Sequence, residues 1–340
     1  MTDKAKQTVN GKAFEYALIR QYDATLSAKG INCVSDGETF RYAKQCYLSL
    51  SEQERSGFDT AAFQTIDTML HIEPGFLRNN RESDILYISL NTDADGENGD
   101  VRDVLFRRFK PYWEVGFSAK NNNDAVKHSR LSGILDFGES WVGVKCSEKY
   151  WNEIEPIFMF LKEATLTGLS WEDLGRDKVE KVYLPLLKAF KSELLRINES
   201  NASIPQKLIQ YLIGSEPFYK IIKDDAHNLV IVKAFNINGE LNKPSNGIKA
   251  QYTTPRLNLP ERIIEFDFKK GSENTMHMIL DGGWEISFRI HNASKKVEPS
   301  LKFDIKLLGN PPYCSRNIYS IEYESDKSIQ RGRRARQRLS

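Results

Sequence analysis

An acid, a hydroxyl and an amine recur at a defined spacing on two neighbouring segments, VRDVLF and WEVGFSAK, which FKPY separates. Strand-forming residues dominate both segments, so they predict an antiparallel hairpin. If it turns at Lys110 and Pro111, the numbers of paired residues add up to about 221. Asp103 then lies opposite Ser118, and Lys120 is the next position on the same face, within diagonal reach of Asp103. A carboxylate, a hydroxyl and an ammonium would converge on one patch.

This set of groups suits the hydrolysis of phosphodiesters. Oxygen ligands hold Mg²⁺, the metal neutralises phosphate charge and acidifies a water, and a lysine orients that water or stabilises the developing charge. We therefore expect Asp103 to bind the metal and Lys120 to serve the nucleophile, with Ser118 beside them. Such a trio is also common on a solvated strand face, so the neighbouring residues are needed to distinguish a catalytic site from a merely solvated face.

A second metal-binding carboxylate is expected where Ser118 stands. Glu114 shares that face but lies about 13 Å from Ser118 along the strand, too far for both to hold one ion comfortably. Asp100 would point to the other face or lie in the preceding loop, and it is a second choice. Glu15, in GKAFEYAL, is the better substitute, because a helix packed on the sheet could deliver its carboxylate to the edge; an exposed helix glutamate is the alternative explanation. Ala119 completes the candidate metal ligands.

The run NNNDAVKHSRLS follows the second strand and predicts the start of a helix, with Asn123 or Asp124 as its N-cap. Such a helix would display donors and positive charge beside the catalytic edge, where the phosphates that flank a scissile bond would lie. The candidate DNA contacts here are Asn121, Lys127, His128 and Arg130.

Helices and one strand are expected before the hairpin. Residues 11–30 repeat apolar positions at helical spacing and stop at Gly30, and residues 36–70 predict one or two further helices. ILYISL, at residues 85–90, predicts a strand. The site would thus be framed by a helical N-terminal region and a small sheet.

The later part of the chain changes from helical to strand periodicity. Residues from Tyr150 to about Ile222 predict helices, with Pro185 near a helix start or at a kink. From Leu229 onward five segments predict strands: LVIVKAFNI, RIIEFDFKK, TMHMIL, WEISFRI and LKFDIKLL. We expect an α/β (α+β) protein in which residues 1–147 form the helices and catalytic core, 148–227 a helical segment, 228–325 a β-rich region, and 326–340 a disordered basic tail; for the β-rich region, DNA recognition is what the family resemblance given below implies.

Composition places the chain among ordinary globular proteins, with 40% hydrophobic and 28% charged residues in 340. The net charge is +2, but without the six basic residues of KSIQRGRRARQRLS the balance is 42 basic to 46 acidic residues, about −4. A polyanion-binding surface on the folded part must therefore come from local clustering, and the tail would either add an unspecific grip on phosphates or only aid solubility.

Several classes of protein are disfavoured. No apolar run approaches the length of a membrane span, and the first residues lack a signal sequence, so we expect a cytoplasmic protein with no membrane partner and with reduced thiols at its four scattered cysteines. The remaining histidines show no HExxH or paired spacing, which argues against a zinc site. GxSxG, GxxxxGK[ST] and GxGxxG are absent, which argues against serine-hydrolase, P-loop and Rossmann chemistry.

The hairpin segments also carry a family resemblance. GDVRDVLF followed by WEVGFSAKNNNDAVKHSRLS resembles the core of the HaeIII-type restriction endonucleases and fits an SxK variant of the PD-(D/E)XK nuclease core. LIQYLIGSEPFYKII, AFNINGELN and GWEISFRIHNASKKVEPSLKFDI resemble further blocks of type II restriction enzymes, so the similarity spans about residues 10 to 320. The resemblance matches Asp103 to the core aspartate, Lys120 to the core lysine and Glu15 to a helix glutamate of related nucleases. It departs at Ser118, which replaces a carboxylate, and this leaves the second metal ligand open.

The resemblance implies a type II restriction endonuclease with a PD-(D/E)XK-like core of a mixed sheet flanked by helices. It implies cleavage of double-stranded DNA with one or two Mg²⁺ ions at a short palindrome, GGCC in this family, giving 5′-phosphate and 3′-hydroxyl ends. Guanine offers N7 and O6 acceptors in the major groove, which suits basic donors. The expected base-reading candidates are Arg289, His291, Asn292, Lys302, Arg316 and Asn317.

A palindromic site further implies a two-fold symmetric homodimer, although a monomer that nicks twice stays open, and a cognate DNA methyltransferase as cellular partner. Two other functions remain open from the sequence. One is a nuclease of structure-dependent or methylation-dependent specificity, which would share Asp103 and Lys120. The other is a non-catalytic DNA-binding module that kept a degenerate nuclease fold, which the serine at position 118 favours.

Overall fold

The computed structural model describes residues 3–78, 84–92, 100–122, 127–309, 311 and 314–321. The basic tail and most of the acidic loop after residue 92 lie outside the described residues. The chain divides by its contacts into two compact units. The first comprises Met1–Asn123, Glu216–Leu257 and Tyr313–Ser340, and the second Asp124–Ser215 and Asn258–Pro312. These units do not follow the linear ranges expected from the sequence, because strands from the later part of the chain complete the first sheet.

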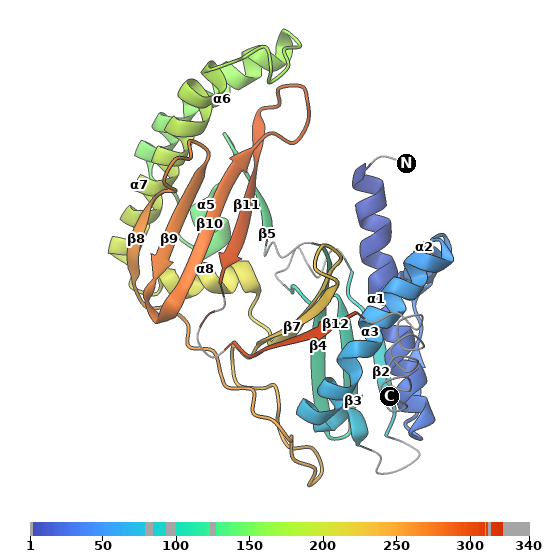
Figure 1. Ribbon diagram of the computed structural model, residues 1–340. Helices are drawn as coiled ribbons and strands as arrows, with labels where there is room; N and C mark the ends of the chain where they lie inside the picture. The colour runs from blue at the N-terminus through green and yellow to red at the C-terminus, as the bar shows by residue number, and fades with distance from the viewer. Residues whose placement is uncertain are drawn as a thin grey trace, which may run out of the picture. The chain divides into compact units, whose positions relative to one another are not determined.

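A mixed seven-stranded sheet forms the centre of the first unit, in the order β1-β2-β3-β4-β6-β7-β12 (Figure 1). Its strands are β1 (Cys33–Ser35), β2 (Leu86–Leu90), β3 (Val104–Phe109), β4 (Tyr112–Asn121), β6 (Phe218–Asp224), β7 (Leu229–Phe235) and β12 (Arg316–Ser320). The pairs β1–β2 and β4–β6 are parallel and the others antiparallel. The predicted mixed sheet is therefore confirmed.

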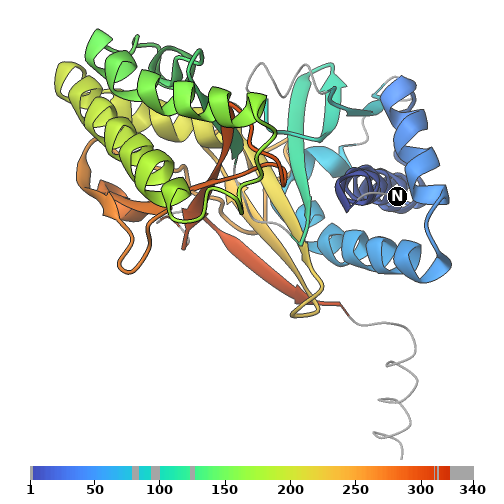
Figure 2. The same cartoon turned by 90° about the horizontal axis from the view of Figure 1, so that it is seen from above.

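Three helices pack on one face of this sheet: α1 (Asp3–Ala28), α2 (Glu38–Leu48) and α3 (Glu52–Ile72) (Figure 2). Tyr22 of α1 contacts the rings of Phe106 and Phe117 at centroid distances of 5.3 and 5.2 Å, and its hydroxyl bonds to Thr65 of α3 at 2.9 Å. Burial of such large rings contributes several kcal/mol, on the order of 2 for each. This aromatic contact fixes which face of β3 and β4 is the interior.

The hairpin has the predicted register. Val104 pairs with Phe117 and Phe109 with Tyr112, so the chain turns at Lys110 and Pro111. Asp103 lies just before the pair of Val104 and Phe117, and its backbone N–H also donates to the carbonyl of Phe117, at 2.7 Å. The predicted helices over residues 11–30 and 36–70 and the strand over residues 85–90 are likewise confirmed.

The second unit is an antiparallel sheet with helices on one face, in the strand order β5-β11-β10-β9-β8. The strands are β5 (Lys127–Ser132), β8 (Ile263–Phe268), β9 (Thr275–Leu280), β10 (Trp284–His291) and β11 (Ser300–Leu308), and the helices are α5 (Phe137–Val142), α6 (Glu148–Leu166), α7 (Leu184–Ser200) and α8 (Ile204–Ile213). Phe190 of α7 packs against Phe288 and Phe303 at centroid distances of 5.5 and 5.0 Å. The helical middle of the sequence and its β-rich end thus share one core.

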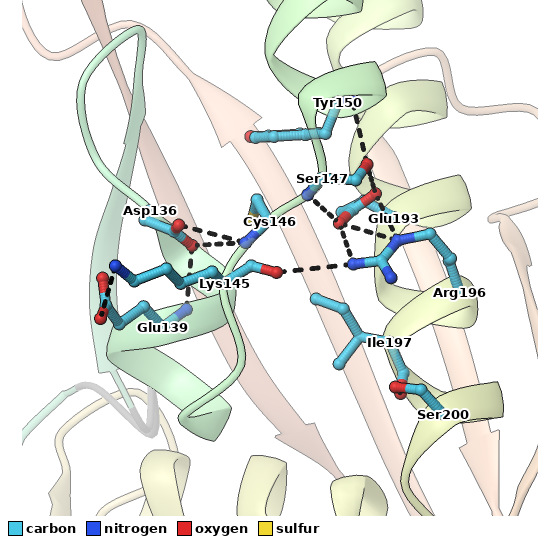
Figure 3. A network of polar contacts seen from close by, with 10 residues as sticks. All are labelled: Asp136, Glu139, Lys145, Cys146, Ser147, Tyr150, Glu193, Arg196, Ile197 and Ser200. Carbon is cyan, nitrogen blue, oxygen red and sulfur yellow. Dashed lines mark hydrogen bonds and ion pairs between the residues drawn. The ribbon is translucent and has the colours of Figure 1, made fainter.

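A polar network sets the starts of two of these helices (Figure 3). Asp136 caps α5 by accepting from the backbone N–H of Glu139 at 2.9 Å, and Ser147 caps α6. Glu193 of α7, only 4% exposed, accepts from the N–H and the hydroxyl of Ser147 at 2.7 and 2.8 Å and pairs with Arg196 at 2.6 Å. The network ties α6 to α7 behind the sheet, and its arrangement is structural.

Two segments differ from the predicted secondary structure. Lys127–Ser132 forms strand β5 and no helix, because its backbone pairs with β11 and its alternate residue Leu131 is buried. The proposed caps Asn123 and Asp124 lie outside the described residues. Phe218–Asp224 is strand β6, although helix was predicted up to about Ile222, because this largely buried segment pairs with β4 on one side and with β7 on the other. Pro185 does begin a helix, near the start of α7.

The four cysteines are free, as expected. Within the described part of the chain, no helix is long and apolar enough to cross a membrane.

Glu73, at the end of α3, is 1% exposed and anchors the irregular segment that follows β7. Its Oε1 accepts from the hydroxyl of Tyr219 at 2.6 Å and from the backbone N–H of Asn242 at 2.7 Å. The amide of Asn242 in turn donates to the carbonyls of Ile72 and Tyr252 at 2.6 and 2.8 Å. Burial raises the pKa of Glu73 to about 7, although the hydrogen bonds from Tyr219 and Asn242 oppose this change.

Replacing this carboxyl, in Glu73→Gln, should change how stability depends on pH. Between pH 4.5 and about 7 the folded protein keeps a proton on Glu73 that the unfolded chain has released, so the free energy of unfolding falls as pH rises through this window. An amide does not ionise. The free energy of unfolding of the variant relative to the wild type should therefore rise between about pH 5 and pH 8, by about 3 kcal/mol at most, and its relative melting temperature should rise with it. A constant difference in thermal melts across this range would contradict the prediction.

Candidate active site

Asp103 accepts hydrogen bonds from three donors at the open end of the hairpin, and two of them, Ser118 and Lys120, were predicted. Its Oδ2 accepts from the backbone N–H of Ala119 at 2.7 Å, from the hydroxyl of Ser118 at 3.3 Å and from the ammonium of Lys120 at 3.1 Å. The side chains of Lys120 and Asp103 are 30% and 24% exposed, so solvent and a ligand can reach the pair. The predicted convergence of acid, hydroxyl and amine is thus present in the structure.

Strand alternation and the position of Asp103 at the end of a strand produce this arrangement. Phe117 and Ala119 belong to the buried core under α1, so Ser118 and Lys120 point to the opposite face of β4. The carboxylate of Asp103, just before β3, lies level with the backbone N–H of Ala119. The Ala119 carbonyl comes two residues after the Phe117 carbonyl, so both point to the same side of β4, toward Asp103. It lies beyond the last paired residues of β3 and β4.

Helix α1 delivers a second carboxylate from the core side of the sheet. Glu15 is 5% exposed, and its Oε2 pairs with the ammonium of Lys12 at 3.0 Å. Burial and, second, the negative charge of Asp103 raise the pKa of Glu15 to about 7, against the opposing effects of Lys12 and Lys120. Because Asp103 and Lys120 both act on the pKa of Glu15, the glutamate belongs to the same electrostatic cluster.

Glu114 and Asp100, the other two candidate metal carboxylates, are engaged by Arg102. The guanidinium of Arg102 bonds to Glu114 at 2.6 Å and to both oxygens of Asp100 at 2.8 Å, and Arg107 also pairs with Glu114. Burial alone would raise the pKa of both carboxyls, but the hydrogen bonds and charges of the arginines outweigh it and lower both values.

Arg102 lies flat over Gly116, where an added Cβ would meet its Cδ at 2.2 Å. These contacts make Asp100 and Glu114 counter-ions of a buried arginine, which fixes the base of the hairpin.

The oxygen atoms at the end of the hairpin fit Mg²⁺. This ion is commonly held by one or two carboxylates together with substrate phosphates and waters. Asp103, Glu15 and the carbonyl of Ala119 offer such a set. Among the described residues no cluster of three or more His, Cys, Asp or Glu side chains could hold a metal, so a site built from many protein ligands is not found in that part of the chain.

The candidates for DNA contact in the second unit lie mainly on the sheet face opposite the helices. His291, Lys302 and Arg130 are paired in register across β10, β11 and β5, and Arg289 lies two residues before His291. His291 bonds to Asp304 at 2.9 Å, and Arg130 bonds to Ser300 at 2.5 Å. The amide of Asn292 donates to the carbonyl of Ser294 at 2.7 Å. Lys127 and His128 belong to β5, and their side chains are outside the described part of the structure.

Another set of basic residues lies in the first unit, at positions paired with Ser118 across the neighbouring strands. Ser118 pairs with Lys220, Lys220 with Lys233, and Lys233 with Arg316, across β4, β6, β7 and β12. Paired residues point to the same side of a sheet, so Arg316 shares the face of Ser118 and Asn317 lies on the other face.

Sequence reasoning missed Lys12, Lys220 and Lys233. The spacing of three residues between Lys12 and Glu15 on a predicted helix could have identified the first. The two others depend on the pairing of β6, a segment whose periodicity predicted a helix.

Among the described residues, the side-chain oxygen of Asn121 is buried and has no hydrogen-bond partner. This residue ends β4, next to Lys120.

The comparisons with known proteins agree on one family. The family model of the HaeIII restriction endonuclease matches residues 11–311. The chain is 39% identical to the type II restriction enzyme HaeIII of Haemophilus aegyptius over 307 residues, which covers 90% of this chain and 95% of that enzyme. No solved structure matches the chain.

Glu114→Gln should separate a structural carboxylate from a metal ligand. Removing its charge weakens the ion pairs with Arg102 and Arg107, so we expect the free energy of unfolding to fall by about 1–3 kcal/mol. Affinity for Mn²⁺, measured by titration calorimetry, should stay at the wild-type value. Unchanged stability together with lost Mn²⁺ affinity would instead identify Glu114 as a ligand.

Proposed function

The chain belongs to the HaeIII restriction endonuclease family of site-specific deoxyribonucleases, which bind double-stranded DNA, and from this premise we propose that the open end of the β3–β4 hairpin is its active site. The observation that supports this most directly is the contact of 3.1 Å between the Lys120 ammonium and the Asp103 carboxylate at a solvent-accessible position. Phosphoryl transfer needs a metal-binding oxygen and a cation at the same phosphate.

In this proposal Asp103, Glu15 and the Ala119 carbonyl would hold one or two Mg²⁺ ions. When bound, Mg²⁺ supplies charge neutralisation at the phosphate and a more acidic water. Lys120 orients the attacking water or stabilises the charge that develops on the phosphate. Ser118 donates to Asp103 and holds its carboxylate in place. Attack on phosphorus with departure of the 3′ oxygen leaves a 3′-hydroxyl and a 5′-phosphate.

We propose GGCC as the recognised sequence, by likeness to the family. The polar face of the second unit supports base reading, because Arg289, His291, Lys302 and Arg130 lie together on it and guanine presents two acceptors to such donors. The remaining candidates are assigned to DNA contact in the same proposal: Asn121, Lys127, His128, Asn292, Arg316 and Asn317. A basic residue in line with Ser118, such as Arg316, suits a backbone phosphate.

The palindrome further supports a homodimer in which each subunit cuts one strand, a monomer that nicks twice being the alternative. A cognate DNA methyltransferase that protects host DNA, and a location in the cytoplasm with that DNA, belong to the same proposal.

Plasmid cleavage tests the active site. Wild-type protein with Mg²⁺ should give discrete fragments that end at GGCC, whereas Asp103→Asn and Lys120→Ala should each lose at least about 100-fold in rate while still binding DNA. Lys110→Ala, at the opposite end of the hairpin, is the matched control and should cut normally. Wild-type rates in Asp103→Asn and Lys120→Ala would refute the site. A wild-type protein that binds but never cuts would favour the non-catalytic module.

Glu15→Gln tests the second metal ligand. A neutral amide is a weaker ligand, so the Mn²⁺ affinity should fall about 10-fold or more, and cleavage should need more Mg²⁺. Glu38→Gln, which changes an exposed glutamate of α2, is the control. If the Mn²⁺ affinity of Glu15→Gln equals that of the control, Glu15 is no ligand.

A further inference from the structure

A glycine lies inside α1 where the protein itself does not require one. Gly11 is well within Asp3–Ala28, and its backbone is not among those with positive φ. A glycine inside a helix is less favourable than alanine, because it loses more conformational freedom on folding. Apart from its chain neighbours and the nearby helix backbone, a Cβ added at Gly11 would meet no heavy atom of the described residues within 4 Å. Packing within the described chain therefore gives no reason for glycine at this position.

Other glycines of the protein are explained by their neighbours. At Gly138 in α5 an added Cβ would approach the carbonyl oxygen of Val144 to 2.4 Å, and at Gly75 it would overlap the ring of Trp113 at 2.1 Å. These positions need a hydrogen in place of a side chain because protein atoms fill the space. At Gly11 the corresponding space is open.

The open space lies beside the proposed active site. Gly11 and Glu15 are four residues apart and so share one face of α1, at about 5–6 Å along the helix. Lys12 adjoins the same place, since its ammonium contacts Glu15 at 3.0 Å and its side chain is 18% exposed. The next residues, Ala13 and Phe14, are fully buried in the core and hold this part of the helix on the sheet.

We propose that the sugar-phosphate backbone of bound double-stranded DNA passes directly over Gly11 and that Lys12 contacts a phosphate next to the scissile one. Glycine is the residue that lets a ligand come close to a helix backbone, and an adjacent lysine supplies the charge that a phosphate needs. The inference rests on the proposed function, because it places the DNA strand beside Asp103 and Glu15. It adds a contact that depends on shape and charge and not on base sequence.

Gly11→Ala separates this role from a purely structural one. Alanine favours the helix, so the melting temperature should rise by about 1–3 °C. The added methyl group should nevertheless weaken binding of the full chain to a short duplex about 10-fold in the presence of Ca²⁺, and Gly11→Leu should weaken it further. Because the contact is to the backbone, the loss should be similar for duplexes with and without GGCC at low salt.

Ala24→Gly is the matched control, since Ala24 is exposed on the same helix. It should lower the melting temperature and leave the affinity for both duplexes unchanged. Lys12→Gln should reduce the slope of log affinity against log salt by about 0.9, the value for one phosphate contact.

A Gly11→Ala protein that melts higher and binds both duplexes like the wild type would overturn the proposal. A Gly11→Ala protein that melts lower would also overturn it, because the glycine would then serve the fold. An unchanged salt slope in Lys12→Gln would refute the phosphate contact. Failure of the proposed function would be recognised by a different result, which is wild-type cleavage in the Asp103→Asn and Lys120→Ala proteins.

Discussion

The carboxylate of Asp103 depends on the register of one hairpin. Three donors reach its Oδ2 only because β3 and β4 are paired so that Asp103 lies level with Ser118 and Ala119. A slip of one residue would turn Ser118 and Lys120 into the core and Phe117 out of it. The rings of Tyr22, Phe106 and Phe117 oppose that slip, because each would lose its buried contacts. The polar site is therefore held in place by apolar packing on the other side of the strands.

Carboxylates around the hairpin end have different environments, and these set what each can do. Asp103 is partly exposed and forms an ion pair with a partly exposed lysine, which suits a carboxylate that must bind a ligand in place of that lysine. Glu15 is buried beside it, with its pKa raised to about 7 first by burial and then by the charge of Asp103. Asp100 and Glu114 both form ion pairs with Arg102, so their negative charges are already balanced within the fold. Similar residues thus differ in exposure and in pKa according to their neighbours.

Local pattern was enough to predict the hairpin, its register and the helices before it, since all of these depend on residues close in sequence. A turn at Lys110 and Pro111 between alternating segments fixes the pairing of Val104 with Phe117 without any distant contact, and this brings the side chain of Asp103 beside Ser118. The position of Glu15 could also be anticipated, because the apolar stripe of α1 decides which side of the helix meets the sheet. The family resemblance extends over most of the chain, and the comparisons with known proteins confirm it.

Segments whose conformation depends on distant partners were predicted wrongly. KHSRLS has the polar character of a helix surface, yet it pairs with β11, about 170 residues later in the chain. FYKII follows helix α8 closely and is buried on both faces, with Lys220 as its one charged residue, so periodicity cannot distinguish a buried strand from a helix. Its parallel neighbour β4 lies about 100 residues earlier. The pairing of Lys220 with Ser118 could not be predicted from the sequence for the same reason.

The chain passes between the two units four times, so neither unit is one continuous stretch of sequence. The second unit is made from two inserts, and the strands that follow each insert, β6 and β12, belong to the sheet of the first unit. A single continuous gene fragment that spans both inserts would therefore also carry β6 and β7 of that sheet. A substitution on the polar face of the second unit leaves this sheet untouched, whereas exchange of the whole fragment replaces two of its strands.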